Sequence, residues 1–153
     1  MVTLNKLIPD FSAKATSNLE IDRDSFKGHK TIIYFYPKDN TPGCTTEGQE
    51  FRDAIDSFKD ANTVIYGVSR DSMKTHENFK AKHEFPFELI SDPEENFCKL
   101  FDVIKLKKLY GKEYLGIDRS TFLIDENGVL QKEWRSVKVK GHVNEVLTAC
   151  QEI

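Results

Sequence analysis

Residues 31–58 read TIIYFYPKDNTPGCTTEGQEFRDAIDSF, an apolar run followed by a short polar loop and a helix-like repeat. The apolar run, 31–35, is β-branched and aromatic throughout, which predicts a buried strand. After the loop, apolar residues recur at the three- and four-residue spacing of one helix face. Thr41 and Pro42 fit the N-cap and the first position of that helix, so Cys44 is expected in its first turn.

The position of Cys44 favours a reactive thiol. A sulfur in the first turn lies among unpaired backbone N–H groups at the positive end of the helix dipole, which stabilises the thiolate. The neighbours of Cys44 are Pro, Gly and Thr in a loop-to-helix turn rather than an apolar helix face. We therefore expect an accessible nucleophile at Cys44 rather than an inert core cysteine.

The rest of the chain alternates strand-like and helix-like segments. A second apolar run, 63–68, follows the Cys44 helix, and this order predicts two parallel strands joined by a helix. Later segments predict a helix over 72–83 and a short helix with Asp92 as its cap and Pro93 at its first position. The last signals are a hairpin, 120–124 and 129–134 around the turn 125–128, and a closing helix with the apolar stripe Val143, Val146, Leu147 and Cys150.

The composition indicates a soluble globular protein. The chain has 153 residues, 39% of them hydrophobic and 31% charged, which suits one domain over residues 1–153. No apolar run approaches the length of a membrane span, and the N-terminus does not resemble a secretion signal, so we expect a cytoplasmic protein. A net charge of -3 gives no electrostatic case for nucleic acid or an anionic membrane, and Lys105, Lys107 and Lys108 are interpreted as a solvated face.

The cysteines and histidines predict neither a disulfide scaffold nor a metal site. Three cysteines without paired spacing fit a reducing compartment in which one thiol carries out chemistry. Cys98 and Cys150 stand among apolar residues and are interpreted as core cysteines. The histidines show no metal-ligand spacing and are assigned to the surface: His29, His76, His83 and His142. We expect no metal and no organic cofactor.

The loop around Cys44 also resembles a known family. Pro37, Thr41 and Cys44 reproduce the Pro-x-x-x-Thr-x-x-Cys motif of peroxiredoxins, and residues 36–48 resemble the bacterioferritin-comigratory, or Q-type, branch of that family. Four further blocks extend the resemblance over nearly the whole chain: LIPDF at 7–11, GVSRDS at 67–72, LISD at 89–92 and DRSTFLID at 118–125. The resemblance implies an α/β, thioredoxin-like fold in its peroxiredoxin variant, with a central mixed sheet flanked by helices.

The resemblance implies a function and roles for five residues. The function is that of a thiol-dependent peroxidase that reduces hydrogen peroxide and organic hydroperoxides through a Cys44 sulfenic acid. Thr41, besides capping the helix, is expected to contact the peroxide and the sulfur, and Pro37 to fix the loop and shield the thiolate from water. Arg119 is expected to support the thiolate and the developing charge on the peroxide, and Glu47 to orient active-site groups.

The resemblance fails at the positions where other members carry a resolving cysteine. Gln49 stands five residues after Cys44, and Lys80 stands in the second predicted helix. We therefore expect a monomer with a one-cysteine cycle, in which thioredoxin, glutaredoxin or a small thiol reduces the Cys44 sulfenic acid. Two alternatives stay open: a peroxidase in which Cys98 or Cys150 resolves Cys44, and a redox sensor or relay that passes oxidation to a partner.

Overall fold

The computed structural model describes all 153 residues. Seven strands form the main sheet, in the order β2-β1-β5-β4-β3-β8-β9, and β6 and β7 form a separate two-stranded hairpin. The elements in chain order are β1 (Ser12–Ala15), β2 (Leu19–Asp22), the 3-10 helix η1 (Arg23–Phe26), β3 (Lys30–Phe35), α1 (Pro42–Asp53), α2 (Ile55–Asp60), β4 (Thr63–Ser69), α3 (Met73–His83), β5 (Glu88–Ser91), α4 (Asn96–Leu100), β6 (Ile104–Leu109), β7 (Lys112–Ile117), β8 (Ser120–Ile124), β9 (Leu130–Trp134) and α5 (His142–Glu152).

The sheet is mixed, as expected for a thioredoxin-like fold. β3, β4 and β5 run parallel at its centre, whereas the β1–β2 pair and the β8–β9 pair join its two sides in antiparallel fashion. The predicted strand-helix-strand unit is confirmed, since α1 and α2 connect the parallel neighbours β3 and β4. The predicted hairpin of β8 and β9 and the closing helix α5 are confirmed as well.

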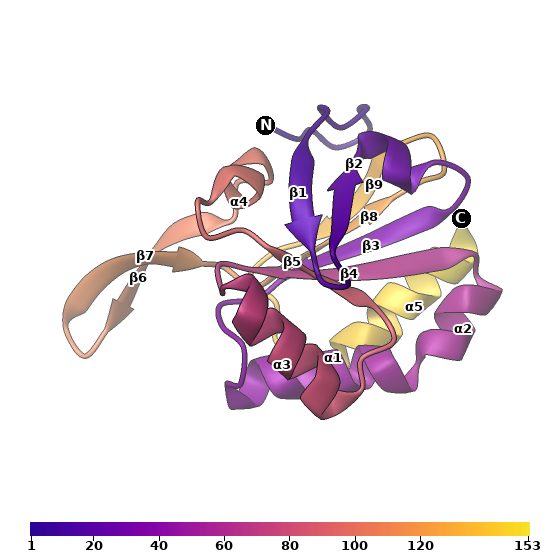
Figure 1. The fold of residues 1–153 in the computed structure, drawn as a ribbon. Helices are drawn as coiled ribbons and strands as arrows, with labels where there is room; N and C mark the ends of the chain where they lie inside the picture. The colour runs from indigo at the N-terminus through magenta and orange to yellow at the C-terminus, as the bar shows by residue number, and fades with distance from the viewer.

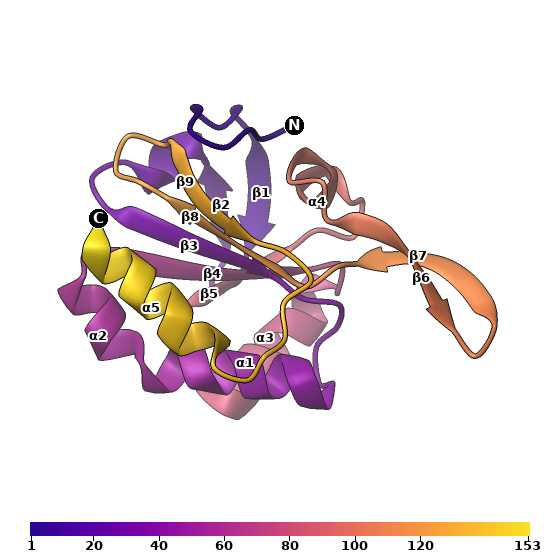
Figure 2. The same cartoon turned by 180° about the vertical axis from the view of Figure 1, so that it is seen from behind.

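Helices cover one face of the sheet, and shorter segments cover the other. α1, α2, α3 and α5 lie on the same side of the strands in both views, opposite η1 and α4 (Figures 1 and 2). The central strand β3 is buried along its whole length and alternates between two cores. Ile32 and Tyr34 belong to the core under the helices, whereas Ile33 and Phe35 belong to the core on the opposite face. No helix is both long enough and apolar enough to cross a membrane.

The third predicted helix begins later than the sequence indicated. α4 starts at Asn96, and Pro93 lies in a turn before it. Asp92 stabilises the helix without being its N-cap, because its carboxylate accepts hydrogen bonds from the N–H groups of Phe97 and Cys98. The N-cap is instead Glu95, which has a left-handed backbone. The prediction that this helix is capped by Asp92 and begins at Pro93 is therefore wrong by about one turn.

Two of the four histidines are not at the surface, which corrects the sequence assignment. His76 and His142 are buried, whereas His29 and His83 are half-buried. Each buried ring has polar partners supplied by distant parts of the chain, Asp39 for His76 and Thr121 for His142. Such partners satisfy a polar ring inside the protein, and they cannot be recognised from spacing along the sequence.

The hairpin of β6 and β7 was not predicted. It projects away from the body of the molecule (Figures 1 and 2) and carries Lys105, Lys107 and Lys108. Exposed apolar side chains accompany the lysines, including the cross-strand pair Leu106 and Leu115.

Candidate active site

Cys44 is the third residue of α1, which begins at the polar loop that leaves β3. Pro42 opens the helix and Thr41 is its N-cap, with an extended backbone, as the sequence predicted. The N–H group of Thr45 donates to the carbonyl of Thr41 at 2.9 Å, which closes the first turn around Cys44. The thiol therefore lies at the positive end of α1, beside the carboxyl end of a parallel strand.

The hydroxyl of Thr41 does not cap the helix. It donates to the carbonyl oxygen of Lys38 at 2.8 Å and makes no capping bond to α1. This contact closes the loop between β3 and α1 on itself. The oxygen lone pairs of Thr41 accept no hydrogen bond within the chain and are available to a ligand.

Cys44 is more buried than the sequence indicated. Only 2% of the residue is exposed, and it packs with the aromatic core under the helices. The expectation of an accessible thiol is therefore wrong, although the helix-terminus position that motivated it is correct. The sulfur is buried because Tyr34 and Tyr36, which precede the loop, belong to the same core as Cys44, so the start of α1 packs against that core.

Arg119 directly precedes β8 and reaches the sulfur across 75 residues of sequence. The antiparallel pairing of β3 with β8 aligns Phe35 with Ser120, which places Arg119 beside the loop that follows β3. Its Nη2 donates to Cys44 Sγ at 3.3 Å. Gly43 leaves room for this contact, because a Cβ atom there would lie 3.3 Å from the same Nη2. The fold thus brings together the two residues that the sequence had only paired by resemblance.

Glu47 holds the other arm of Arg119. It lies one helical turn after Cys44, is fully buried, and accepts a hydrogen bond from Arg119 Nη1 at 2.6 Å. Burial raises the pKa of Glu47 to about 7, against the opposing effect of Arg119. Burial also disfavours the charge on Arg119, but the negative groups of Glu47 and Cys44 outweigh it and raise the arginine pKa.

Pro37 lies half-buried in the loop that carries these groups. It follows Tyr36 directly and precedes the Lys38 carbonyl that accepts from Thr41. The loop also contains Asp39, a buried acid that the sequence analysis did not single out. Its position inside the motif loop was the only available signal, because two of its partners, His76 and Asp71, come from distant parts of the chain.

The other two cysteines are buried and make no hydrogen bond to the residues of this arrangement. Cys98 of α4 lies in the core on the opposite face of the sheet from Cys44, and Cys150 lies near the end of α5. Both are fully buried, as predicted, and no cysteine forms a disulfide. Burial raises the pKa of the Cys98 thiol far above its usual value and that of Cys150 to about 11. These thiols are therefore protonated and weakly nucleophilic in the folded protein.

The chain is similar to known proteins along nearly its whole length. Residues 4–133 match the model of the AhpC/TSA family. The peroxiredoxin Bcp of Bacillus subtilis strain 168 is 49% identical over 152 residues, which cover 99% of this chain and 97% of that protein. The peroxiredoxin Bcp of Xanthomonas campestris is 56% identical over 122 residues, covering 80% of this chain and 76% of that protein.

Solved structures agree with these relatives. The bacterioferritin comigratory protein of Xanthomonas campestris, solved in work on its alkyl peroxide reduction activity, has a TM-score of 0.89 at 47% identity, covering 93% of this chain and 90% of that one. A mutant of Xylella fastidiosa PrxQ has a TM-score of 0.93 at 38% identity, covering 99% of this chain and 97% of that one. With its thiol, arginine and fold in place, the chain therefore belongs to the AhpC/TSA family and, within it, to the Bcp or PrxQ peroxiredoxins, which are thiol-dependent peroxidases.

Proposed function

We propose that this protein reduces hydrogen peroxide and organic hydroperoxides through a sulfenic acid on Cys44. The observation that carries the proposal is the contact of Arg119 Nη2 with Cys44 Sγ at 3.3 Å, at the N-terminus of α1. A guanidinium and free helix N–H groups both favour a thiolate, and they also stabilise the charge that develops on a peroxide.

The chemical step follows from this arrangement. The Cys44 thiolate attacks the terminal peroxide oxygen, a sulfur–oxygen bond forms, and the oxygen–oxygen bond breaks. Its electron pair leaves on the distal oxygen, which takes a proton from water and departs as water or an alcohol. Cys44 remains as S–OH, oxidised by two electrons, while the peroxide is reduced by two.

The remaining motif residues position this step. The free lone pairs of the Thr41 hydroxyl accept a hydrogen bond from the peroxide, while the hydroxyl itself donates to the Lys38 carbonyl. Glu47 fixes the plane of the Arg119 guanidinium through the 2.6 Å ion pair, so that Nη2 faces the sulfur. Pro37 stiffens the loop and limits the access of water to the thiolate.

We propose that an external thiol completes the cycle. Its sulfur attacks Cys44 S–OH, water leaves, a mixed disulfide forms, and a second thiol reduces that disulfide. Gln49 and Lys80 support this scheme, because each residue is engaged in polar contacts, with His83 and with Glu88 respectively, where a resolving cysteine would stand. Resolution by Cys98 would require passage from one face of the sheet to the other.

The site is built by one chain, which supports a monomer. All five site residues come from three segments of this chain: the β3–α1 loop, α1 and the residue directly before β8. One domain over residues 1–153 and a reducing compartment such as the cytoplasm complete the proposal, since three free thiols persist best where disulfides are rare. Thioredoxin, glutaredoxin or a small thiol can serve as the reductant.

The variant Cys44→Ser tests the proposal directly. It should lose peroxide consumption to background while keeping its far-ultraviolet circular dichroism spectrum, because a serine hydroxyl is not ionised near neutral pH. The matched control Cys98→Ser should retain the wild-type rate of peroxide consumption. Substantial turnover by Cys44→Ser, or a burst of peroxide consumption equal to that of the wild type, would contradict the assignment.

A further inference from the structure

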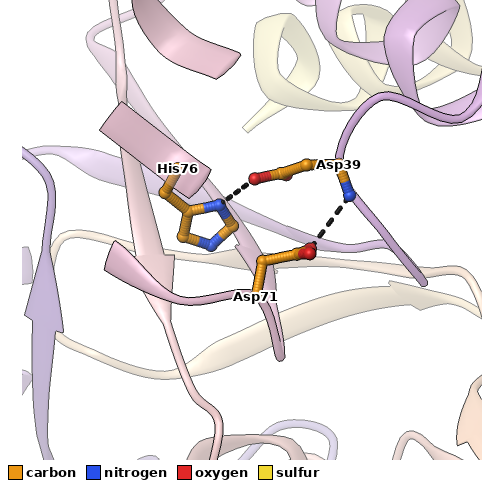
Figure 3. A group of neighbouring side chains, drawn as sticks. All are labelled: Asp39, Asp71 and His76. Carbon is orange, nitrogen blue, oxygen red and sulfur yellow. Dashed lines mark hydrogen bonds and ion pairs between the residues drawn. The ribbon is translucent and has the colours of Figure 1, made fainter. Parts of the chain in front are cut away.

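A buried polar network holds the active-site loop between β3 and α1 through Asp39. This residue takes no part in the chemical step described above. Asp39 lies in the middle of the loop and is 3% exposed, and His76 of α3 is fully buried. His76 Nδ1 and Asp39 Oδ2 lie 2.6 Å apart, while the Tyr36 hydroxyl donates to Asp39 Oδ1 at 2.6 Å. The backbone N–H of Asp39 donates to Asp71 Oδ2 at 2.9 Å (Figure 3).

The hydrogen bonds of His76 show how this network is charged. Its Nε2 lies 2.9 Å from the carbonyl oxygen of Ile90, which can only accept, so Nε2 carries a proton. The short contact between Nδ1 and the Asp39 carboxyl then shares one further proton. The pair is neutral as a whole, whichever of the two atoms holds that proton. Such a pair buries no net charge, but removal of either partner leaves a buried group unsatisfied.

The same contacts argue against a cation at this place. Asp39, Asp71 and His76 place one ligand atom each within 4.8 Å of one another. Both ring nitrogens of His76 are engaged, however, by Asp39 and by Ile90. The Asp71 carboxylate in turn accepts from the Ser69 hydroxyl and from the Asp39 backbone. These groups satisfy one another, and they join the loop to β4 and α3.

The network lies at the centre of the loop that leads into α1 and Cys44. Asp39 stands two residues after Pro37 and two residues before Thr41, and α1 begins directly afterwards. Its side chain and its backbone are both bonded to the β4–α3 segment, through His76 and Asp71. Displacement of the loop from this segment would therefore require both anchors to break together.

We propose that Asp39 is a positioning residue whose two anchors, His76 and Asp71, set the balance between a closed and an open active-site loop. The proposal rests on the proposed Cys44 cycle. The closed loop places Cys44 against Arg119 for attack on peroxide. With Cys44 only 2% exposed, the thiol that resolves the sulfenic acid needs the open loop. A weaker anchor should therefore affect the two halves of the cycle in opposite directions.

The test measures the two half-reactions separately by rapid mixing. His76→Leu removes both ring nitrogens that bond Asp39 and Ile90, and we expect oxidation by hydrogen peroxide to slow by about tenfold or more. Resolution of the preformed sulfenic acid by dithiothreitol, followed by quenching and intact mass, should become several times faster. Hydrogen–deuterium exchange of residues 37–47 should increase. His76→Asn, whose amide retains one donor near Nδ1, should restore part of each effect.

Two further variants separate this role from a general loss of stability. Leu130→Ala creates a cavity in the core on the opposite face and should leave both rates near wild type. Asp71→Ala removes the backbone anchor but leaves the buried pair intact, so it provides the measurement if His76→Leu does not fold. It should shift both rates in the same directions as His76→Leu, by smaller factors.

The outcomes distinguish this proposal from the proposed function. If peroxide oxidises Cys44→Ser as fast as the wild type, the Cys44 cycle itself is wrong. If the reaction requires Cys44 but the anchor variants leave both rates unchanged, or slow both together, the positioning role of Asp39 is wrong and the cycle stands.

Discussion

At the scale of single residues, Arg119 connects the two negative groups of the active site. One arm donates to the Cys44 sulfur and the other to the buried carboxylate of Glu47. Arg119→Met keeps most of the bulk but removes the charge and all five donors, so the peroxide step should slow by about 100-fold or more. Stopped-flow oxidation by hydrogen peroxide measures this rate, and Arg52→Met on the same helix α1 provides a control expected near wild type. An unchanged oxidation rate in Arg119→Met would remove the arginine from the mechanism.

Glu47 predicts a pH dependence of stability. Its pKa is about 7 in the folded protein, above the unfolded value of 4.5. Between these pH values the folded state binds a proton at Glu47 that the unfolded state has released. The free energy of unfolding should therefore fall as the pH rises from about 4.5 to about 7, and this contribution should level off at higher pH. Glu47→Gln cannot titrate, so wild type should lose on the order of 1–3 kcal/mol relative to the variant between pH 5 and 8. Urea unfolding at each pH measures the difference, and parallel curves would contradict the raised pKa.

The residues of the site differ in how far the sequence could predict them. Pro37, Thr41 and Cys44 are close together in the chain, so their motif and the helix start were sufficient to place them. Arg119 was assigned by resemblance alone, because only the pairing of β3 with β8 brings it to the sulfur. His76 was assigned to the surface, since its partner Asp39 lies 37 residues away and no local pattern joins them.

At the scale of elements, the three cysteines belong to three different helices. Cys44 lies in the first turn of α1, whereas Cys98 and Cys150 are fully buried in α4 and α5. The double variant Cys98→Ser, Cys150→Ser should therefore keep most of the turnover supported by an external thiol reductant. Its peroxide-treated form should react with dimedone at Cys44, as detected by intact mass.

Each single variant provides the control for this experiment. Loss of repeated turnover in Cys98→Ser or Cys150→Ser, with the first oxidation of Cys44 preserved, would identify that residue as the resolving cysteine. The double variant would then accumulate an oxidised form that the reductant does not restore, and the one-cysteine cycle would be wrong.

The elements that the sequence predicted correctly are those with a strong local pattern. β3, β4 and α3 were found within one residue of their ends, because their apolar spacing and caps agree. The start of α4 was misplaced because Asp92 stabilises it through side-chain bonds from outside the helix. The hairpin of β6 and β7 was missed because its residues are largely exposed and lysine-rich, so no buried apolar run marks it.

At the scale of the whole molecule, the sheet separates two cores and places the active site at the carboxyl end of its strand β3. The helical face contributes α1 with Cys44, and the residue directly before β8 of the same sheet contributes the Arg119 side chain from the same chain. The site thus requires no residue from a second copy. The exposed apolar side chains concentrate on the hairpin of β6 and β7, where Leu106 and Leu115 lie side by side.

This arrangement predicts a monomer in both redox states. Sedimentation velocity should show a single species near 17.6 kDa for the reduced protein and for the protein treated with peroxide. Cys98 and Cys150 are fully buried, so only Cys44 could link two copies, and its 2% exposure hinders that reaction in the closed loop. Leu106→Lys adds charge to the only exposed apolar pair of the hairpin and should leave the sedimentation unchanged. A dimer in the wild type that dissociates in Leu106→Lys would contradict the monomer and would identify the hairpin as the interface between copies.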